Sequence, residues 1–384
     1  MFEQNNNQER RKSETERVEE SVLTEIDEVV RERHGDKEYH APEHSSTVEK
    51  NSAEIFSIIE ENNPGTITEA MERARKTGAR GHDMYIETAI DPKTGALIRL
   101  RGLGPEHMPE NVQAVLKEQG KPLVGNEEAS AVELLGVVTR NDPDQKIYTS
   151  EVNDLMVENV RATYPIPSFV TFPEETYSTT EAGENRIVII NPDTKAPVDI
   201  TEFFPIKDGK AIGLKMDQFI DEETKLGALA VAIGDLSQGG RFGSEVFRDE
   251  GNREFWESRP AMTDLARRGV ENLKSDEKAL LAKEVLGWVE TQTGFLLHQK
   301  MRFERMLNTN HAFRALPNAE ATKAAMMSRY SEWDRNILAT VDRVKEMRGT
   351  FADLHDEASY SDLSANTRLE KLVAEMSYGD VERG

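Results

Sequence analysis

Hydrophobic residues near the N-terminus recur with a helical period, but they form only a narrow stripe. The stripe consists of Val18, Val22, Ile26 and Val29 or Val30. It predicts a charged helix from Gln8 to Arg33. Because so narrow a stripe buries little area, we expect an arm that becomes ordered only against the rest of the chain, a partner or another copy. The polar stretch His34–Ser52, interrupted by Pro42, predicts a linker.

Short strand-like runs separated by turns dominate the region before Pro260. Fourteen of the 15 prolines lie at or before that residue, and proline suits turns better than helix interiors. Two pairs of runs joined by turn sequences predict antiparallel hairpins, at residues 84–101 and 203–215. Further strands are predicted at Glu133–Thr139, Ser168–Phe172 and Arg186–Ile190. Helices are predicted near Ile55, from Thr66 to Lys76, at Pro109–Gln119 and at Glu151–Thr163.

Beyond Pro260 the pattern becomes helical almost to the C-terminus, and Pro317 is the only proline. One helix is predicted to begin at Ser275 and a second to follow Gly294. Two more are predicted from Asn318 to Gly349 and from Leu363 to Met376. The longest carries a continuous apolar stripe at spacings of three and four. The stripe consists of Tyr330, Trp333, Ile337, Val341 and Val344. It predicts the seam of a helical bundle.

These patterns together predict an α+β fold with three regions. Residues 1–52 form a charged N-terminal helical arm and a flexible linker. Residues 53–258 form an acidic, antiparallel-rich mixed domain, because strand pairs joined by tight turns must be antiparallel. Residues 259–384 form a C-terminal helical bundle.

Composition and charge exclude several classes of function. The chain of 384 residues has no cysteine, which excludes disulfides, thiolate nucleophiles, iron–sulfur clusters and sulfur-ligated zinc. Its net charge is −23, and residues 81–255 contribute 31 acidic against 17 basic side chains. Since nucleic acids are bound through Lys and Arg, we expect no nucleic-acid partner.

No run approaches the roughly 20 apolar residues that cross a bilayer. The stretch Met1 to Arg11 lacks the apolar core of a secretory signal. We therefore expect a soluble, cytoplasmic protein that has no membrane partner.

A glycine-rich segment, Gly234–Ser244, follows the apolar run Leu226–Ile233, for which we expect a strand. Backbone amides can approach an anion where side chains are absent. A nucleotide-triphosphate loop is excluded because Gly240 and Arg241 stand where Lys and Ser or Thr are required. The candidate ligand-binding residues are Ser237, Gly239, Gly240, Arg241, Gly243 and Ser244. The alternative is a flexible connection into the helical region.

His82 and Asp83, with Glu87 four residues further on, are the candidate catalytic residues. They precede the first predicted strand and could offer a general base at a sheet edge. Neighbouring side chains in an extended segment point to opposite faces. We therefore expect no coupled pair of His82 and Asp83.

A second group of histidines predicts no metal site. His34, His40 and His44 carry metal-ligating groups, but their spacing is irregular and the predicted linker offers no scaffold to hold them. The C-terminal helices also lack the Glu-x-x-His pairs of a carboxylate-bridged metal centre. We therefore expect neither a metal nor another cofactor.

Two main hypotheses about function remain open. The leading one is a non-enzymatic interaction or assembly protein that binds another protein, or itself, through its arm and helical seam. The alternative is an enzyme for a small or phosphorylated substrate, with the segment 234–244 lining a cleft at the domain junction. A third hypothesis, an acidic mimic of nucleic acid, requires carboxylates along one ridge.

Overall fold

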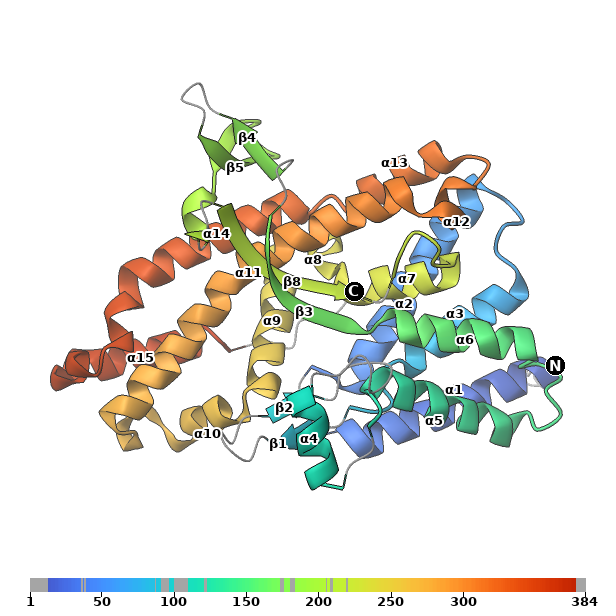
Figure 1. Cartoon of the computed structure of the whole chain (residues 1–384), viewed down its shortest axis with the longest axis horizontal. Coiled ribbons are helices and arrows are strands. Elements are labelled where there is room, and N and C mark those ends of the chain that lie inside the picture. The colour runs from blue at the N-terminus through green and yellow to red at the C-terminus, as the bar shows by residue number, and fades with distance from the viewer. Residues whose placement is uncertain are drawn as a thin grey trace, which may run out of the picture.

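Helices make up most of the chain, and small antiparallel sheets lie among them (Figure 1). The computed structural model describes residues 13–35, 37, 39–86, 88–90, 97–99, 110–120, 123–172, 176–179, 184–204, 206–207, 210–218 and 220–377. The first nine helices are α1 (Glu14–His34), α2 (Pro42–Asn62), α3 (Glu69–Gly81), α4 (Glu110–Glu118), α5 (Asn126–Asn141), α6 (Ser150–Ala162), α7 (Leu226–Leu236), α8 (Gln238–Arg241) and α9 (Ser244–Ser258). They are followed by α10 (Pro260–Arg268), α11 (Ser275–Thr309), α12 (His311–Arg314), α13 (Ala319–Arg329), α14 (Trp333–Phe351) and α15 (Leu363–Ala374).

The N-terminal helix α1 is part of the folded core. A capping box of Ser13 and Glu16 starts it, and its buried residues Val22, Ile26 and Val30 belong to a hydrophobic cluster that it forms with α3 and α5. Of the three partners expected for this helix, the rest of the chain is the one observed. The predicted linker is wrong beyond residue 41, because Pro42 occupies the first turn of α2, where its missing N–H costs nothing.

Helices α2, α3, α6 and α7 pack against one another and form the layer that carries the site described below. The expected strand at Leu226–Ile233 is wrong: these residues lie in α7, which is buried from Leu226 to Asp235. A short run that is apolar on every side fits a buried strand and a buried helix equally. Small residues let α7 approach its neighbours, since a Cβ at Gly234 would lie 3.0 Å from the backbone nitrogen of Ser52 on α2.

Both predicted hairpins are confirmed. Strand β1 (Thr88–Ile90) pairs antiparallel with β2 (Leu97–Arg99), and β7 (Ile206–Lys207) pairs with β8 (Lys210–Gln218). Strand β8 also pairs with β3 (Pro165–Thr171). The last sheet has the order β4 (Tyr177–Thr179), β5 (Asn185–Ile190), β6 (Pro197–Asp199) and projects from the helices (Figure 1). The predicted strand Glu133–Thr139 is wrong, since it lies within α5.

The C-terminal region is helical, as predicted, but its helices are divided differently. Helix α11 continues through Gly294 for 35 residues, a length of about 52 Å. Gly294 allows close packing there, because a Cβ added at Gly213 of β8 would lie 3.4 Å from its Cα. The helix predicted from Asn318 to Gly349 is interrupted between α13 and α14. The five residues of its apolar stripe are all buried within this chain.

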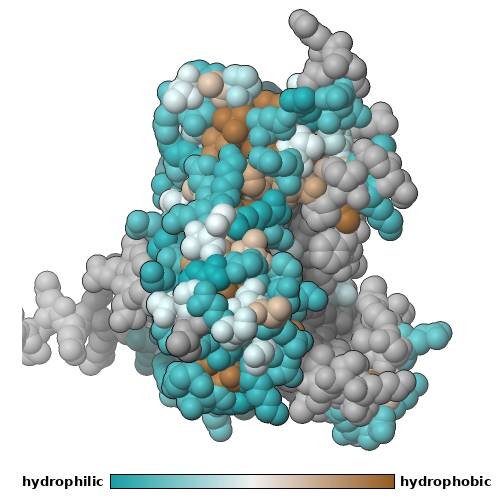
Figure 2. Space-filling model, turned by 90° about the vertical axis from the view of Figure 1, so that its left-hand side faces the viewer, coloured by the Kyte–Doolittle hydropathy of each residue, from teal (hydrophilic) through white to brown (hydrophobic). Residues whose placement is uncertain are grey.

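The structure is therefore mostly helical with small antiparallel sheets, which confirms a mixed fold but with less strand than expected. One hydrophobic cluster contains residues from both sides of Pro260, from Ile55 to Met376. The division at residues 52 and 258 stays a prediction. On the face that Figure 2 shows, hydrophilic residues predominate and hydrophobic ones form small separate patches. Within the described residues, no helix is long and apolar enough to span a bilayer.

Candidate metal centre

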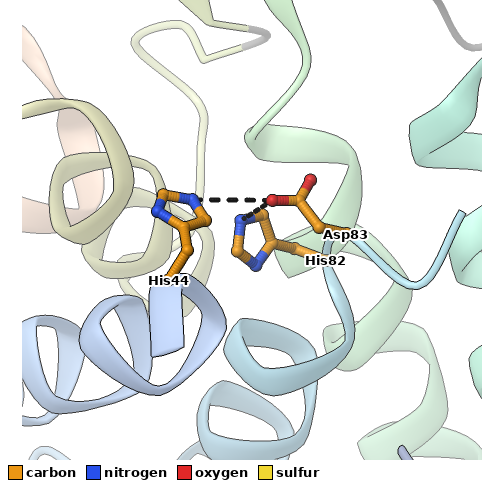
Figure 3. Close-up of side chains that lie close together, drawn as sticks. All are labelled: His44, His82 and Asp83. Atoms are coloured by element: carbon orange, nitrogen blue, oxygen red, sulfur yellow. Dashed lines mark ion pairs between the residues drawn. The ribbon is translucent and has the colours of Figure 1, made fainter. Parts of the chain in front are cut away.

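Four side chains from three helices converge at one point. His44 lies in the first turn of α2, His82 and Asp83 directly follow α3, and Asp235 lies in the last turn of α7. Figure 3 shows both rings and the Asp83 carboxylate turned toward one another. The His44 and His82 side chains are only 2% exposed, against 10% for Asp235 and 20% for Asp83.

The distances between these groups match those between ligands of one metal ion. His44 Nε2 lies 3.5 Å from Asp83 Oδ2 and 3.3 Å from Asp235 Oδ1. His82 Nε2 lies 2.9 Å and 3.8 Å from the same two oxygens. Bonds of about 2.1 Å to one ion separate neighbouring ligands by about 3.0 Å in octahedral and about 3.4 Å in tetrahedral geometry. His44, His82 and Asp83 by themselves satisfy the spacing of a metal-binding cluster.

The expectation that His82 and Asp83 point to opposite faces is wrong. His82 is the C-cap of α3 and keeps helical dihedral angles, with φ −62° and ψ −31°. Successive side chains in helical backbone are about 100° apart rather than 180°. Both side chains can therefore reach the same point, which an extended strand would prevent.

Hydrogen bonding orients His82 as a ligand. Its Nδ1 lies 2.8 Å from the carbonyl oxygen of Ala79 and donates to it. Such a bond leaves the lone pair on Nε2 and fixes the ring, the usual arrangement around metal-ligating histidines. Nε2 is buried and lies 2.9 Å from an Asp83 oxygen, so a proton or a metal ion at this nitrogen would be shared with that carboxylate.

The electrostatics of the site favour a cation. Burial opposes protonation of His82, but Asp83 and Asp235 outweigh it and raise its pKa to about 9. Burial by itself would raise the pKa of Asp83, yet His82, His40 and His44 hold that pKa well below its usual range. Without a metal, a proton on His82 supplies the positive charge that the carboxylates require.

The four residues line a cavity of about 150 Å³. Its wall also includes polar residues of α5 and α9 and several aromatic rings. The aromatic residues are Tyr39, Phe247, Trp288 and Phe295, and the additional carboxylates are Glu127, Glu250 and Glu254. An ion at the four-residue site would therefore face a cavity large enough for a small ligand.

Glu257 of α9 holds the segment that enters α2. One of its carboxylate oxygens accepts from the backbone nitrogens of Tyr39 (2.7 Å) and His40 (3.0 Å). The other lies 2.5 Å from His40 Nδ1. The Tyr39 ring packs against His44, with ring centroids 4.6 Å apart. His40 and Tyr39 are thereby fixed at the wall of the cavity.

The glycine-rich segment is helical, so the expected loop is wrong. Gly239 and Gly240 lie in α8, where an added Cβ would collide with Leu296 at Gly239 and with Trp333 at Gly240. Arg241 forms an ion pair with Glu54. Ser237 is a buried helix C-cap, whereas Gly243 and Ser244 start α9 on the exposed surface. Of these six candidates, Gly239 lines the cavity.

The other predicted residues are divided between the site and the rest of the structure. His82 and Asp83 belong to the site, while Glu87 lies outside the described residues. His34 is buried and lies 3.4 Å from the Met84 carbonyl oxygen. The premise that His40 and His44 lack a scaffold is wrong, since α2 holds His44. Sequence reasoning assigned no role to Asp235. A signal for the helix that carries His44 was present, because Pro42 suits the first turn of a helix.

Comparison with protein-family models, with curated proteins and with solved structures finds no match for this chain.

Proposed function

We propose that this protein is an enzyme that uses one divalent metal ion to hydrolyse a small substrate. The observation that carries the proposal is the convergence of four side chains on the wall of a cavity, where each histidine Nε2 lies 2.9–3.8 Å from an oxygen of both aspartates. Two imidazoles and two carboxylates suit ions such as Zn²⁺, Fe²⁺ or Mn²⁺. Hydrolysis follows from what such an ion supplies when bound, namely Lewis acidity and a bound water with a pKa near 7.

The position of the four ligands supports a catalytic rather than a structural ion. A structural site is closed by its protein ligands, whereas a catalytic site keeps a position open toward the substrate. All four residues line the cavity. With octahedral geometry, four protein ligands leave two positions for water and substrate.

His40 is the candidate general base. Its Nδ1 bonds to Glu257, which orients the ring and leaves Nε2 as the nitrogen that can accept a proton from the cavity. This pairing of a carboxylate and an imidazole holds the base in one tautomer, as in other hydrolytic sites. Phe247 and Phe295, which also line the cavity, would limit the access of bulk water.

The interaction hypothesis has less support from the packing. It rested on an isolated helical arm and on a long apolar seam, and both bury their apolar residues within this chain. Light scattering of the purified protein tests it directly, since a monomer with no recovered partner would leave it without a basis.

Metal binding and hydrolysis can be tested together. The purified, metal-stripped protein is titrated with Mn²⁺ and Zn²⁺, and then screened against small esters, amides and phosphate esters. We expect one ion per chain and a metal-dependent hydrolytic activity. His44→Ala, His82→Ala and Asp235→Ala should lose both. His355→Ala, which removes an exposed histidine, is the matched control and should retain both.

An ion bound with equal affinity by the wild type and by His82→Ala would refute the assigned site. A bound ion without any hydrolytic activity in the screen would count against the proposed reaction, but not against the metal centre.

A further inference from the structure

The two oxygens of the Asp235 carboxylate lie in different surroundings. Oδ1 faces the metal centre, 3.3 Å from His44 Nε2 and 3.8 Å from His82 Nε2. Oδ2 accepts a hydrogen bond of 2.8 Å from Gln218 Nε2. Gln218 is the last residue of β8 and is only 3% exposed, so this bond is sheltered from water. One oxygen is therefore available to an ion, while the other is held by the protein.

A buried arginine fixes the orientation of the Gln218 amide. Arg302 of α11 is also 3% exposed, and its Nη1 donates to Gln218 Oε1 over 2.6 Å. A guanidinium can only donate hydrogen bonds, and an ionised carboxylate can only accept them. The amide oxygen must therefore face Arg302, and the amide nitrogen must face Asp235. Strand β8 packs along α11 (Figure 1), which holds the two side chains together.

The backbone next to Asp235 is held independently of Gln218. Asn51 of α2 is 2% exposed, and its Nδ2 donates to the carbonyl oxygen of Gly234 over 3.0 Å. This bond joins the end of α7 to the helix that carries His44. Replacing Gln218 should therefore release the Asp235 side chain while its backbone stays in position.

We infer that Gln218 is a positioning residue of the metal centre, which keeps Asp235 a ligand through Oδ1 alone. A carboxylate that bound the ion through both oxygens would occupy two positions around it. By holding Oδ2, Gln218 leaves one of these positions to water or substrate. The inference rests on the proposed function, because it requires Asp235 to be a metal ligand.

The amide also separates two opposite charges. A guanidinium in direct contact with Asp235 would neutralise the carboxylate and compete with the ion for it. Because Gln218 lies between them, Arg302 orients the ligand through a neutral group. The carboxylate then keeps the charge with which it attracts a cation.

Gln218→Met tests the inference, because methionine has a similar volume but donates no hydrogen bond. Metal-stripped wild-type and variant proteins are titrated calorimetrically with Mn²⁺. We expect the variant to bind the ion about 10–100-fold more weakly, the usual effect of losing such a partner. Thr322→Val is the matched control, since Thr322 is also buried and its hydroxyl accepts from Asn63 at the other end of α2. It should lower the stability and leave the affinity for Mn²⁺ unchanged.

A double variant separates positioning from a merely structural role. In Asp235→Asn, Gln218 Nε2 would attract the new amide oxygen, so the amide nitrogen would face the ion and could not bind it. Adding Gln218→Met removes this constraint and lets the oxygen turn to the ion. The double variant should therefore bind Mn²⁺ about threefold or more tightly than Asp235→Asn. A structural role of Gln218 predicts weaker binding in both backgrounds.

Circular dichroism verifies that each variant is folded. Should Gln218→Met fail to fold, Gln218→Glu retains a partner for Arg302. Combined with Asp235→Asn, its carboxylate accepts from the amide nitrogen and turns the amide oxygen to the ion, so the same gain in affinity is expected.

Two results would overturn the inference: an affinity for Mn²⁺ that Gln218→Met leaves unchanged, or a double variant that binds no more tightly than Asp235→Asn. If the wild type binds no Mn²⁺ at all, the proposed function fails. One bound ion whose affinity does not depend on Gln218 refutes this inference alone.

Discussion

Metal binding at the four-residue site should strengthen steeply as the pH rises. His82 binds a metal only as neutral imidazole, and in the metal-free protein Asp83 and Asp235 outweigh burial and raise its pKa to about 9. Below that pH the incoming ion must displace a proton. The affinity is therefore expected to rise about tenfold from pH 7 to pH 8 and about fiftyfold from pH 7 to pH 9, or about 2.3 kcal/mol in all.

Calorimetric titration with Mn²⁺ at several pH values measures this slope. Repeating it at pH 7.5 in buffers of different ionisation enthalpy counts the protons released, and about one per ion is expected. Asp83→Asn removes the strongest partner of the His82 proton as well as one ligand. This variant should bind Mn²⁺ more weakly and with a shallower pH dependence. An affinity that does not change between pH 7 and pH 9 would refute the reasoning.

Three further predictions concern stability. In the metal-free protein, the raised pKa of His82 contributes stability that is fully present below about pH 6.5 and is lost as the pH rises through about 9; thermal unfolding without metal should show this decline, and a constant midpoint would contradict it. Ile26→Ala should lower the free energy of unfolding by about 2–5 kcal/mol in urea titrations, because Ile26 is fully buried. A change below 0.5 kcal/mol would indicate that α1 contributes little to the core, as the sequence analysis expected. Gly240→Ala should cost about 1–3 kcal/mol by overpacking against Trp333, and an unchanged urea midpoint would show that the ring moves aside freely.

Local signals in the sequence predicted local structure well. The turn between the strands of each hairpin acts over a few residues, so it can be read from the chain directly. The run Leu226–Ile233 was assigned incorrectly because its burial on all sides is decided by α2 and α6, which are distant in the sequence. Periodicity carries no information about such neighbours.

In the metal centre, too, some residues could be identified from local sequence signals, while others depend on contacts between distant segments. His82 and Asp83 were singled out from the sequence, but their joint orientation depends on the helical backbone at the end of α3. His44 and Asp235 are about 190 residues apart, and only the packing of α2 on α7 brings them together. The glycines of α8 were the opposite case, since their spacing indicated a ligand loop while their contacts show that they are required for packing.

The most direct test of the metal centre is an anomalous difference map from crystals of the wild-type protein soaked with Mn²⁺. The proposed function predicts a single strong peak about 2.0–2.3 Å from His44 Nε2, His82 Nε2, Asp83 Oδ2 and Asp235 Oδ1. A map without a peak at this point, or with its only peak elsewhere on the chain, would contradict it.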